Sequence, residues 1–220
     1  MNNPARIAVL ISGSGSNLQA LLDHTQRPSF PGNVVAVISD NPGAYGLQRA
    51  QRAGIDTTVV ERAPLASRSA FDNALAAAVD ACTPDIVVLA GFMRIIRGAL
   101  VERYAGRMLN IHPALLPKYK GLNTHQRCLD NGDLMHGTTV HFVSAELDGG
   151  PAVIQAELTV EPDDSSDSLM TRVQALEHTI YPMAVRWLAE GRLKLARDAV
   201  YLDGQALDAP VVVSAASLVA

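Results

Sequence analysis

The chain has 220 residues, of which 48% are hydrophobic and 18% are charged. This length fits one domain with a sizeable core, and the composition excludes disordered, collagen-like and disulfide-rich proteins. The net charge of −4 provides no basic field that would attract nucleic acid or an anionic membrane, so we expect neither as a partner.

The sequence also predicts a cytoplasmic protein. The longest apolar stretch, residues 86–93, is much shorter than the roughly 20 residues that cross a bilayer. The first residues run into a strand-like segment without the apolar core of a secretion signal. Cys82 and Cys128 lie far apart in the sequence, which is typical of reduced thiols rather than of a disulfide framework.

The N-terminal half has the pattern of alternating strands and helices. Apolar runs that are typical of strands occur at residues 6–11, 34–39, 57–60, 86–90 and 107–111. Helical spacing of apolar residues follows the first run and recurs at residues 46–53, 67–81 and 95–104. This alternation predicts a parallel sheet with helices on both faces and right-handed crossovers.

The C-terminal half has a different pattern. Residues 113–132 are rich in Pro, Lys, Gly and Asn, and they predict a long loop with at most a short helix at 125–129. Residues 138–143 and 153–160 alternate as strands, so the sheet should become mixed or antiparallel here. Asp164 or Ser165 can cap a long amphipathic helix that reaches Trp187, and residues 193–202 predict a terminal hairpin or tail.

These elements together predict an α/β, Rossmann-like sheet, parallel in its N-terminal half and mixed or antiparallel in its C-terminal half. Helices should cover both faces. We expect a single domain over residues 1–205 and a C-terminal tail over residues 206–220.

A glycine-rich loop at residues 12–17 stands between the first strand and the first helix. Such a loop can present backbone N–H groups and a helix N-terminus to a phosphate. Leu18 replaces the third glycine of the dinucleotide fingerprint, so the pattern favours a single phosphate, although Asp40 stands where a ribose-binding acid could lie. The alternative is a tight turn that uses glycine only for its backbone freedom.

Asn110 and His112 end the fifth predicted strand. Because side chains alternate along a strand, both should face the same space, at the strand ends where α/β sheets bind ligands. An amide and an imidazolium can stabilise the oxyanion formed when a nucleophile attacks a carbonyl. Asp148 could orient and charge the imidazole. The alternatives are backbone capping by Asn110 and His112, and a plain Asp-Gly turn at Asp148.

Other polar residues give weaker signals. His125, His136 and His141 do not have metal-ligand spacing, so we expect no metal. Gln174 and Glu177 lie one helical turn apart and are either site residues or part of a solvated helix face. Residues 93–96 either wall a ligand pocket or begin a helix.

Four segments in this order carry a family resemblance: residues 8–20, 87–94 (VVLAGFMR), 110–119 (NIHPALLPKY) and 136–150, which end in ELDGG. With them the chain resembles the folate-dependent formyltransferases, and among these the group that formylates glycinamide ribonucleotide. The resemblance covers about residues 5 to 204 and implies that residues 1–205 form a formyltransferase catalytic domain.

The resemblance implies transfer of the formyl group of 10-formyltetrahydrofolate, a co-substrate, to the amine of 5-phosphoribosylglycinamide in de novo purine (IMP) biosynthesis. The amine would attack directly and form a tetrahedral intermediate, without a covalent enzyme intermediate. Asn110 and His112 would stabilise the oxyanion, and Asp148 would keep His112 charged and assist proton transfer. The partners would be these small molecules alone, and the protein a monomer or weak homodimer.

The resemblance also assigns binding residues. The ribonucleotide would contact Gly15, Ser16, Asn17, Leu18, Gln19, Gln174, Ala175, Leu176 and Glu177. The folate would contact Arg68, Met93, Arg94, Ile95, Ile96, Asn110, Ser144, Ala145, Glu146, Leu147 and Asp148, with Arg68 facing the glutamate tail.

Two departures from the family pattern fall in one loop. The family usually has Pro-Gly-Leu-His-Thr-His where this chain has Lys120 and Asn123 in place of Pro and the first His. We expect these changes to affect loop ordering and closure more than the chemistry. Ser14 replaces a commoner Asn, and its backbone role should persist.

Several alternative functions share features with this hypothesis. A 10-formyltetrahydrofolate hydrolase normally has an N-terminal regulatory domain, and a methionyl-tRNA formyltransferase a further C-terminal domain that 220 residues would not accommodate. A noncatalytic folate- or nucleotide-binding homologue could keep the fold without turnover. A nicotinamide-dependent oxidoreductase would depend on the glycine loop and Asp40. The length and the glycine loop favour the ribonucleotide.

Overall fold

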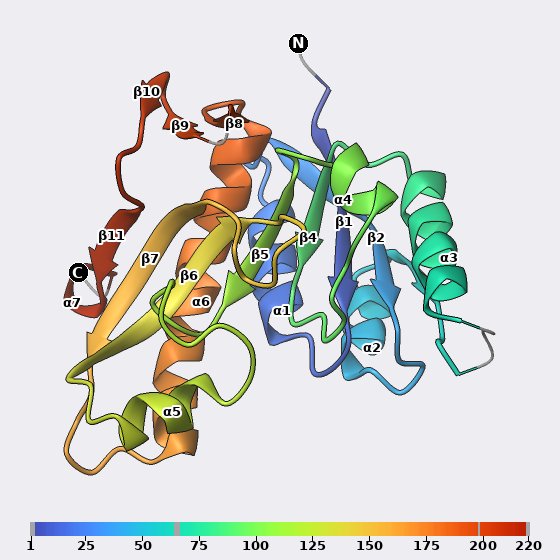
Figure 1. Ribbon diagram of the computed structural model, residues 1–220. Coiled ribbons are helices and arrows are strands. Elements are labelled where there is room, and N and C mark those ends of the chain that lie inside the picture. Colours follow the sequence, from blue (N-terminus) through green and yellow to red (C-terminus); the bar gives the residue numbers. More distant parts are fainter. Residues whose placement is uncertain (1–2, 64–66, 198, 219–220) are drawn as a thin grey trace.

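The centre of the computed structural model is a large sheet, and the structure describes residues 3–63, 67–197 and 199–218 (Figure 1). The strands of this sheet are β1 (Ala5–Ile11), β2 (Gly32–Ser39), β3 (Asp56–Val59), β4 (Ile86–Leu89), β5 (Met108–His112), β6 (Met135–Phe142), β7 (Ala152–Thr159) and β11 (Val211–Ser214). They lie in the order β11-β7-β6-β5-β4-β1-β2-β3.

The direction of the strands changes in the middle of the sheet. β1 to β5 run parallel to one another, whereas β6 is antiparallel to both β5 and β7. The Rossmann-like prediction of a parallel first half and a mixed second half is therefore confirmed.

Helices pack on both faces of the sheet (Figure 1). One core joins α1 (Ser16–Thr25), α2 (Tyr45–Arg52) and α6 (Ser166–Ala189) to the sheet, and the other joins α3 (Arg68–Ala81) and α4 (Ala99–Arg103). Along β4, Ile86 and Val88 belong to the first core, while Val87 and Leu89 belong to the second. This alternation explains why the strand is apolar at every position.

The long helix α6 begins where the sequence predicts. The Ser165 side chain accepts a hydrogen bond from the Ser168 backbone N–H, as an N-cap does. Near its middle, the fully buried Tyr181 places its hydroxyl 2.8 Å from the carbonyl oxygen of Leu89 and 3.0 Å from that of Leu109. This contact fixes α6 against the last residue of β4 and the second residue of β5.

The structure defines the extent of two short helices, α4 and α5 (Thr124–Asp130). The fourth helix is shorter than the predicted 95–104, because residues 95–98 form an irregular segment that ends at Gly98 with a positive φ of 65°. The short helix in the long loop is α5.

The C-terminal residues take part in the fold. The hairpin expected at 193–202 consists of β8 (Leu193–Ala196) and β9 (Ala199–Leu202), which form a small sheet with β10 (Gln205–Ala206). Residues 206–220, predicted to be a tail, supply β11, which runs parallel to β7 at the edge of the main sheet, and α7 (Ala215–Leu218). Residue 205 is therefore not a boundary of the main sheet; residues 219–220 lie outside the described part.

Candidate active site

The three residues singled out for carbonyl chemistry lie together. Asn110 and His112 are two positions apart on β5 and project from the same face of the strand, while Asp148 comes from the loop between β6 and β7. Nδ1 of His112 lies 3.4 Å from Oδ2 of Asp148, and these two side chains are 7% and 9% exposed. A titratable pair is therefore held out of bulk water beside an amide.

The second ring nitrogen of His112 also faces an oxygen. Its Nε2 lies 2.8 Å from the carbonyl oxygen of Tyr119. A carbonyl and a carboxylate are both acceptors, and an imidazolium has an N–H for each of them. Both ring nitrogens of His112 therefore face an acceptor.

Asp148 is placed by a tightly constrained loop. Its φ is +47°, and its Oδ2 accepts a hydrogen bond of 2.9 Å from the Gly121 backbone N–H. At Gly150, a Cβ atom would lie 1.8 Å from the Phe142 carbonyl oxygen, so no other residue fits without moving the chain. The Asp-Gly-Gly sequence thus brings the carboxylate to His112 by a close backbone approach that a side chain would prevent.

His141 joins this group, although its position in the sequence indicates no role in the chemistry. In the antiparallel pairing of β5 with β6 it stands opposite Asn110, and the amide Nδ2 of Asn110 lies 3.1 Å from its Nε2. Its Nδ1–H donates to the Phe142 carbonyl oxygen at 2.9 Å, and burial lowers the pKa of His141. The neutral ring therefore accepts a hydrogen bond from Asn110 and fixes the orientation of the amide. Only the strand register could have revealed this pair.

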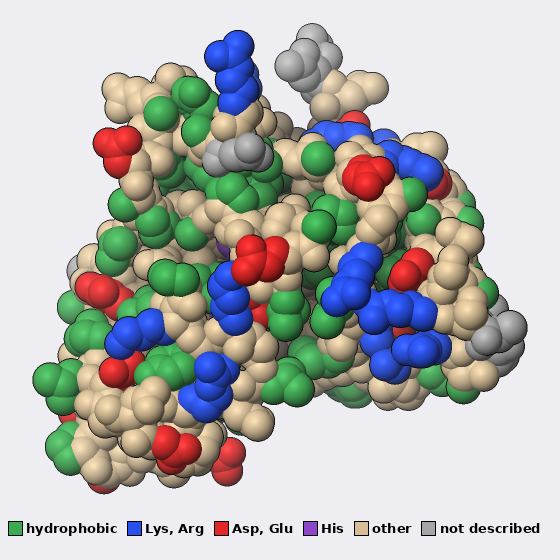
Figure 2. Space-filling view, in the orientation of Figure 1, with side chains coloured by type: hydrophobic (Ala, Val, Ile, Leu, Met, Phe, Trp, Pro, Cys, Tyr) green, Lys and Arg blue, Asp and Glu red, His purple; other side chains and the backbone are tan. Residues whose placement is uncertain are grey.

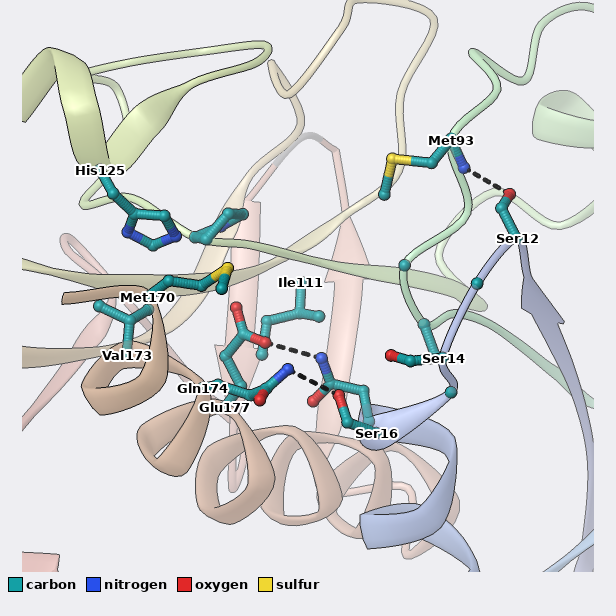
Figure 3. Close-up of a pocket in the computed structure, with 16 residues that line it drawn as sticks. Ser12, Ser14, Ser16, Met93, Ile111, His125, Met170, Val173, Gln174 and Glu177 are labelled. Atoms are coloured by element: carbon teal, nitrogen blue, oxygen red, sulfur yellow. Dashed lines mark hydrogen bonds between the residues drawn. The ribbon is translucent and has the colours of Figure 1, made fainter. Parts of the chain in front are cut away.

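A cavity of about 340 Å³, the loop cavity, lies beside the glycine-rich loop. It is lined by the loop at residues 12–17, by Ile111 and Pro113 around the end of β5, and by Gln174 and Glu177 of α6 (Figure 3). Gln174 Nε2 donates to Ser16 Oγ at 2.8 Å, so the helix and the loop are joined across the cavity. Gly15, Ser16, Asn17, Gln174 and Glu177, all predicted ribonucleotide contacts, meet here.

Two polar groups in the loop cavity are buried. Asn17 Nδ2 donates to Glu177 Oε2 at 2.7 Å, and burial raises the pKa of Glu177. Asn17 is 8% exposed, and its Oδ1 has no hydrogen-bond partner among the described residues. A buried acceptor without a partner is costly, so it indicates a place for a ligand's donor.

The other predicted ribonucleotide residues lie around this cavity rather than in it. Leu18 and Leu176 are buried in the core, and Ala175 is exposed. Gln19 lines a separate cavity on the outer side of α1. Their side chains do not line the loop cavity.

Two smaller cavities gather the predicted folate contacts. The strand cavity, about 70 Å³, is lined by Arg94, Ile95, Ile96, Asn110, Ser144, Glu146, Leu147 and Asp148, together with His141. The arginine cavity, about 190 Å³, is lined by Arg68, Met93, Arg94 and Ile95, together with Arg62. Figure 2 shows Lys and Arg side chains gathered beside the lower end of α3. Ala145 is exposed at the rim.

Asp40 forms an ion pair within the fold. Its Oδ2 accepts a hydrogen bond of 2.7 Å from Arg94 Nε, and its side chain is 4% exposed. The carboxylate therefore anchors an arginine that lines the strand and arginine cavities. Because Asp40 is paired with Arg94, it does not support a ribose-binding acid or a dinucleotide site.

The two departures in the long loop have physical consequences. Lys120 Nζ lies 2.7 Å from Glu146 Oε1, so an ion pair joins this loop to the loop that carries Asp148. Asn123 has a φ of +57° at the start of α5, a conformation that asparagine tolerates well. Both residues are therefore compatible with the observed conformation of this loop, which contacts His112 through the Tyr119 carbonyl oxygen.

Two other kinds of feature, a metal site and a membrane-spanning helix, are not found among the described residues. In the ranges 3–63, 67–197 and 199–218, no group of three or more His, Cys, Asp or Glu side chains is placed to hold a metal ion. No helix in the same ranges has the length and apolar character needed to span a bilayer.

Known proteins match most of the chain. A family model described as "Formyl transferase" matches residues 5–185. Phosphoribosylglycinamide formyltransferase of Escherichia coli (strain K12) is 53% identical over 201 residues, which are 91% of this chain and 95% of that protein. The trifunctional purine biosynthetic protein adenosine-3 of Bos taurus is 45% identical over 194 residues, 88% of this chain but 19% of that protein.

Solved structures agree with the sequence comparison. A phosphoribosylglycinamide formyltransferase from Coxiella burnetii, in complex with CHES, superposes with a TM-score of 0.91 at 47% identity and covers 95% of this chain and 99% of that chain. Glycinamide ribonucleotide transformylase 1 from Symbiobacterium toebii gives a TM-score of 0.88 at 46% identity, covering 92% and 95%. The chain therefore belongs to the formyl transferase family, in the group of the phosphoribosylglycinamide formyltransferases.

Proposed function

We propose that the protein transfers the formyl group of 10-formyltetrahydrofolate to the amine of 5-phosphoribosylglycinamide, in de novo purine synthesis. One observation carries the proposal: the end of β5 separates two cavities. Asn110 lines the strand cavity, while Ile111 and Pro113 line the loop cavity. A folate in the first cavity and a ribonucleotide in the second would meet at the end of this strand.

The chemistry follows from the groups at this junction. The substrate amine attacks the formyl carbon, a C–N bond forms, and the carbonyl oxygen becomes an oxyanion. The second N–H of the Asn110 amide and the Nε2–H of His112 stabilise this charge, and Nε2 exchanges its contact with Tyr119 for the oxyanion. Breaking the bond to the folate nitrogen then completes the transfer.

Proton movement is assigned to Asp148. The attacking amine loses a proton, and the folate nitrogen gains one as it leaves. Asp148 accepts the first proton through a water molecule, and the same water delivers a proton to the folate nitrogen as it leaves. The Asp148 carboxylate, 3.4 Å from the ring, keeps His112 charged. No step needs a covalent bond between enzyme and substrate.

The remaining assignments complete the proposal. The phosphate binds at residues 15–19, and the ribose and glycinamide end at residues 174–177, where Leu176 packs in the core and holds the helix in place. The pterin occupies the strand cavity, and the glutamate tail lies near Arg68. The protein works in the cytoplasm on these two small molecules, without nucleic acid or membrane, as a monomer or weak homodimer; its two cysteines are free thiols.

The test is release of tetrahydrofolate by purified protein, with and without 5-phosphoribosylglycinamide. Asp148→Asn should abolish release, while Asp163→Asn, a matched change at an exposed position, should not. Release without the ribonucleotide would identify a hydrolase instead. Folate binding without any release would identify a noncatalytic homologue.

A further inference from the structure

The loop cavity lacks a permanent positive charge. None of the described residues that line it is a lysine or an arginine, and Glu177 contributes a carboxyl group. A phosphate monoester carries a charge of about −1.5 to −2 at neutral pH. Within this cavity the phosphate would meet only N–H groups, the N-terminus of α1 and uncharged side chains, so a cation just outside the cavity would strengthen its binding.

Arg49 of α2 lies directly behind the glycine-rich loop. Its Nε donates to the Ser14 carbonyl oxygen at 2.9 Å, and its Nη1 donates to Gln19 Oε1 at 3.1 Å. The guanidinium also lies 5.0 Å from the centre of the Tyr45 ring. These contacts hold the charge in one place, and since arginine has five N–H donors, three remain beyond these two bonds.

The close packing of α2 on the loop fixes this position. A Cβ on Gly15 would lie 2.6 Å from the Gly46 Cα, so these two backbones touch only because both residues are glycine. The Gly46 N–H donates to the Gly13 carbonyl oxygen at 3.1 Å. The carbonyl groups of Gly13 and Ser14 therefore both accept hydrogen bonds from α2. With these carbonyl oxygens directed toward α2, N–H groups of the loop can bind an anion on the other side.

A second cavity of about 340 Å³, the outer cavity, links Arg49 to the substrate site. Ser16 lines both the outer cavity and the loop cavity. Arg27 and Arg49 line the outer cavity against one carboxylate, Asp23. Burial, and then the charge of Arg49, lower the pKa of His178 on the same wall, which agrees with a positive local potential.

We propose that Arg49 is the cation of the phosphate subsite: it binds a phosphate oxygen from the outer side while the N–H groups around Ser16 bind the others. The inference rests on the proposed function, because the phosphate is that of the ribonucleotide. It also assigns Arg49 a second task, which is to hold the Ser14 carbonyl away from the phosphate. Phosphorylated substrates are thereby preferred over their dephosphorylated forms.

Kinetics with two substrates test the proposal. Arg49→Ala should raise the KM for 5-phosphoribosylglycinamide about 10- to 100-fold, the usual loss for a hydrogen bond to a charged group, with little change in kcat. The kcat/KM for ribosylglycinamide, which lacks the phosphate, should not change. Arg49→Lys should recover part of the loss, because lysine keeps the charge without the planar fork.

Arg52→Ala is the matched control. Arg52 is on the same helix, bonds the Tyr45 hydroxyl at 3.0 Å and is exposed, but it does not line the outer cavity. Its loss should leave both KM values near those of the wild type. An equal effect of Arg49→Ala on the two substrates would show a merely structural role, and equal behaviour of the Arg49 and Arg52 variants would show a general charge effect; either result overturns the proposal.

A binding measurement separates this inference from the proposed function. Inorganic phosphate should raise the Tm of the wild type and of Arg52→Ala, and raise that of Arg49→Ala much less. If the protein does not formylate the ribonucleotide but this pattern holds, the proposed function fails and the anion site stands. If it does formylate the ribonucleotide and all three proteins respond alike to phosphate, the role of Arg49 is refuted.

Discussion

Mild acid should destabilise the protein through His136. This ring is 1% exposed, and its Nε2 lies 3.0 Å from Nδ1 of His125. Burial, with a smaller contribution from the charge of His125, lowers the pKa of His136 from 6.5 to about 4. In the unfolded chain the ring should titrate near its ordinary value, so the unfolded state takes up the proton first as the pH falls.

The size of the effect follows from this pKa difference. Each tenfold change in proton affinity is worth 1.36 kcal/mol, so the folded protein should lose about 3 kcal/mol of unfolding free energy through His136. This contribution to stability is fully present above about pH 6.5 and is lost progressively as the pH falls to about 4.

Urea unfolding at several pH values between about 7 and 4 measures this loss. His136→Gln keeps an N–H for His125 but does not titrate, so its stability should fall by about 3 kcal/mol less than that of the wild type. His24→Gln, at a half-buried histidine of α1, is the control and should retain most of the wild-type pH dependence. Equal losses in the wild type and in His136→Gln would refute the reasoning.

Four further outcomes are expected. Asn110→Ala should lower kcat by roughly 10² to 10³, the scale of a lost oxyanion donor, and a near-normal rate would reject its role. His141→Leu should lower kcat about tenfold with little change in either KM, since it releases the Asn110 amide; an unchanged kcat would contradict this positioning. Burial raises the pKa of Glu177, so the stability that its proton provides is present below pH 4.5 and is lost as the pH rises. Glu177→Gln should therefore keep or raise the Tm at neutral pH while raising the KM for the ribonucleotide, and a lower Tm would count against it. His112→Ala and Asp148→Asn should not add in a double variant, because both act on one proton, and additive losses in kcat/KM would show separate roles.

The local pattern of the sequence predicts much of the site. The two-residue period of a strand places Asn110 and His112 on one face, and the glycine-rich loop precedes a helix as expected. Ser165 marks the start of α6, and the apolar runs give the strands of the parallel half. These features depend on neighbours a few residues apart, so the sequence determines them directly.

The tertiary structure decides the contacts between distant segments. The register of β6 against β5 places His141 opposite Asn110, and the position of α2 brings Arg49 behind the glycine-rich loop. Asp40 pairs with Arg94, which is 54 residues away. Spacing in the sequence does not encode such pairs, because strand register and helix packing are set by the burial of whole faces rather than by any one side chain.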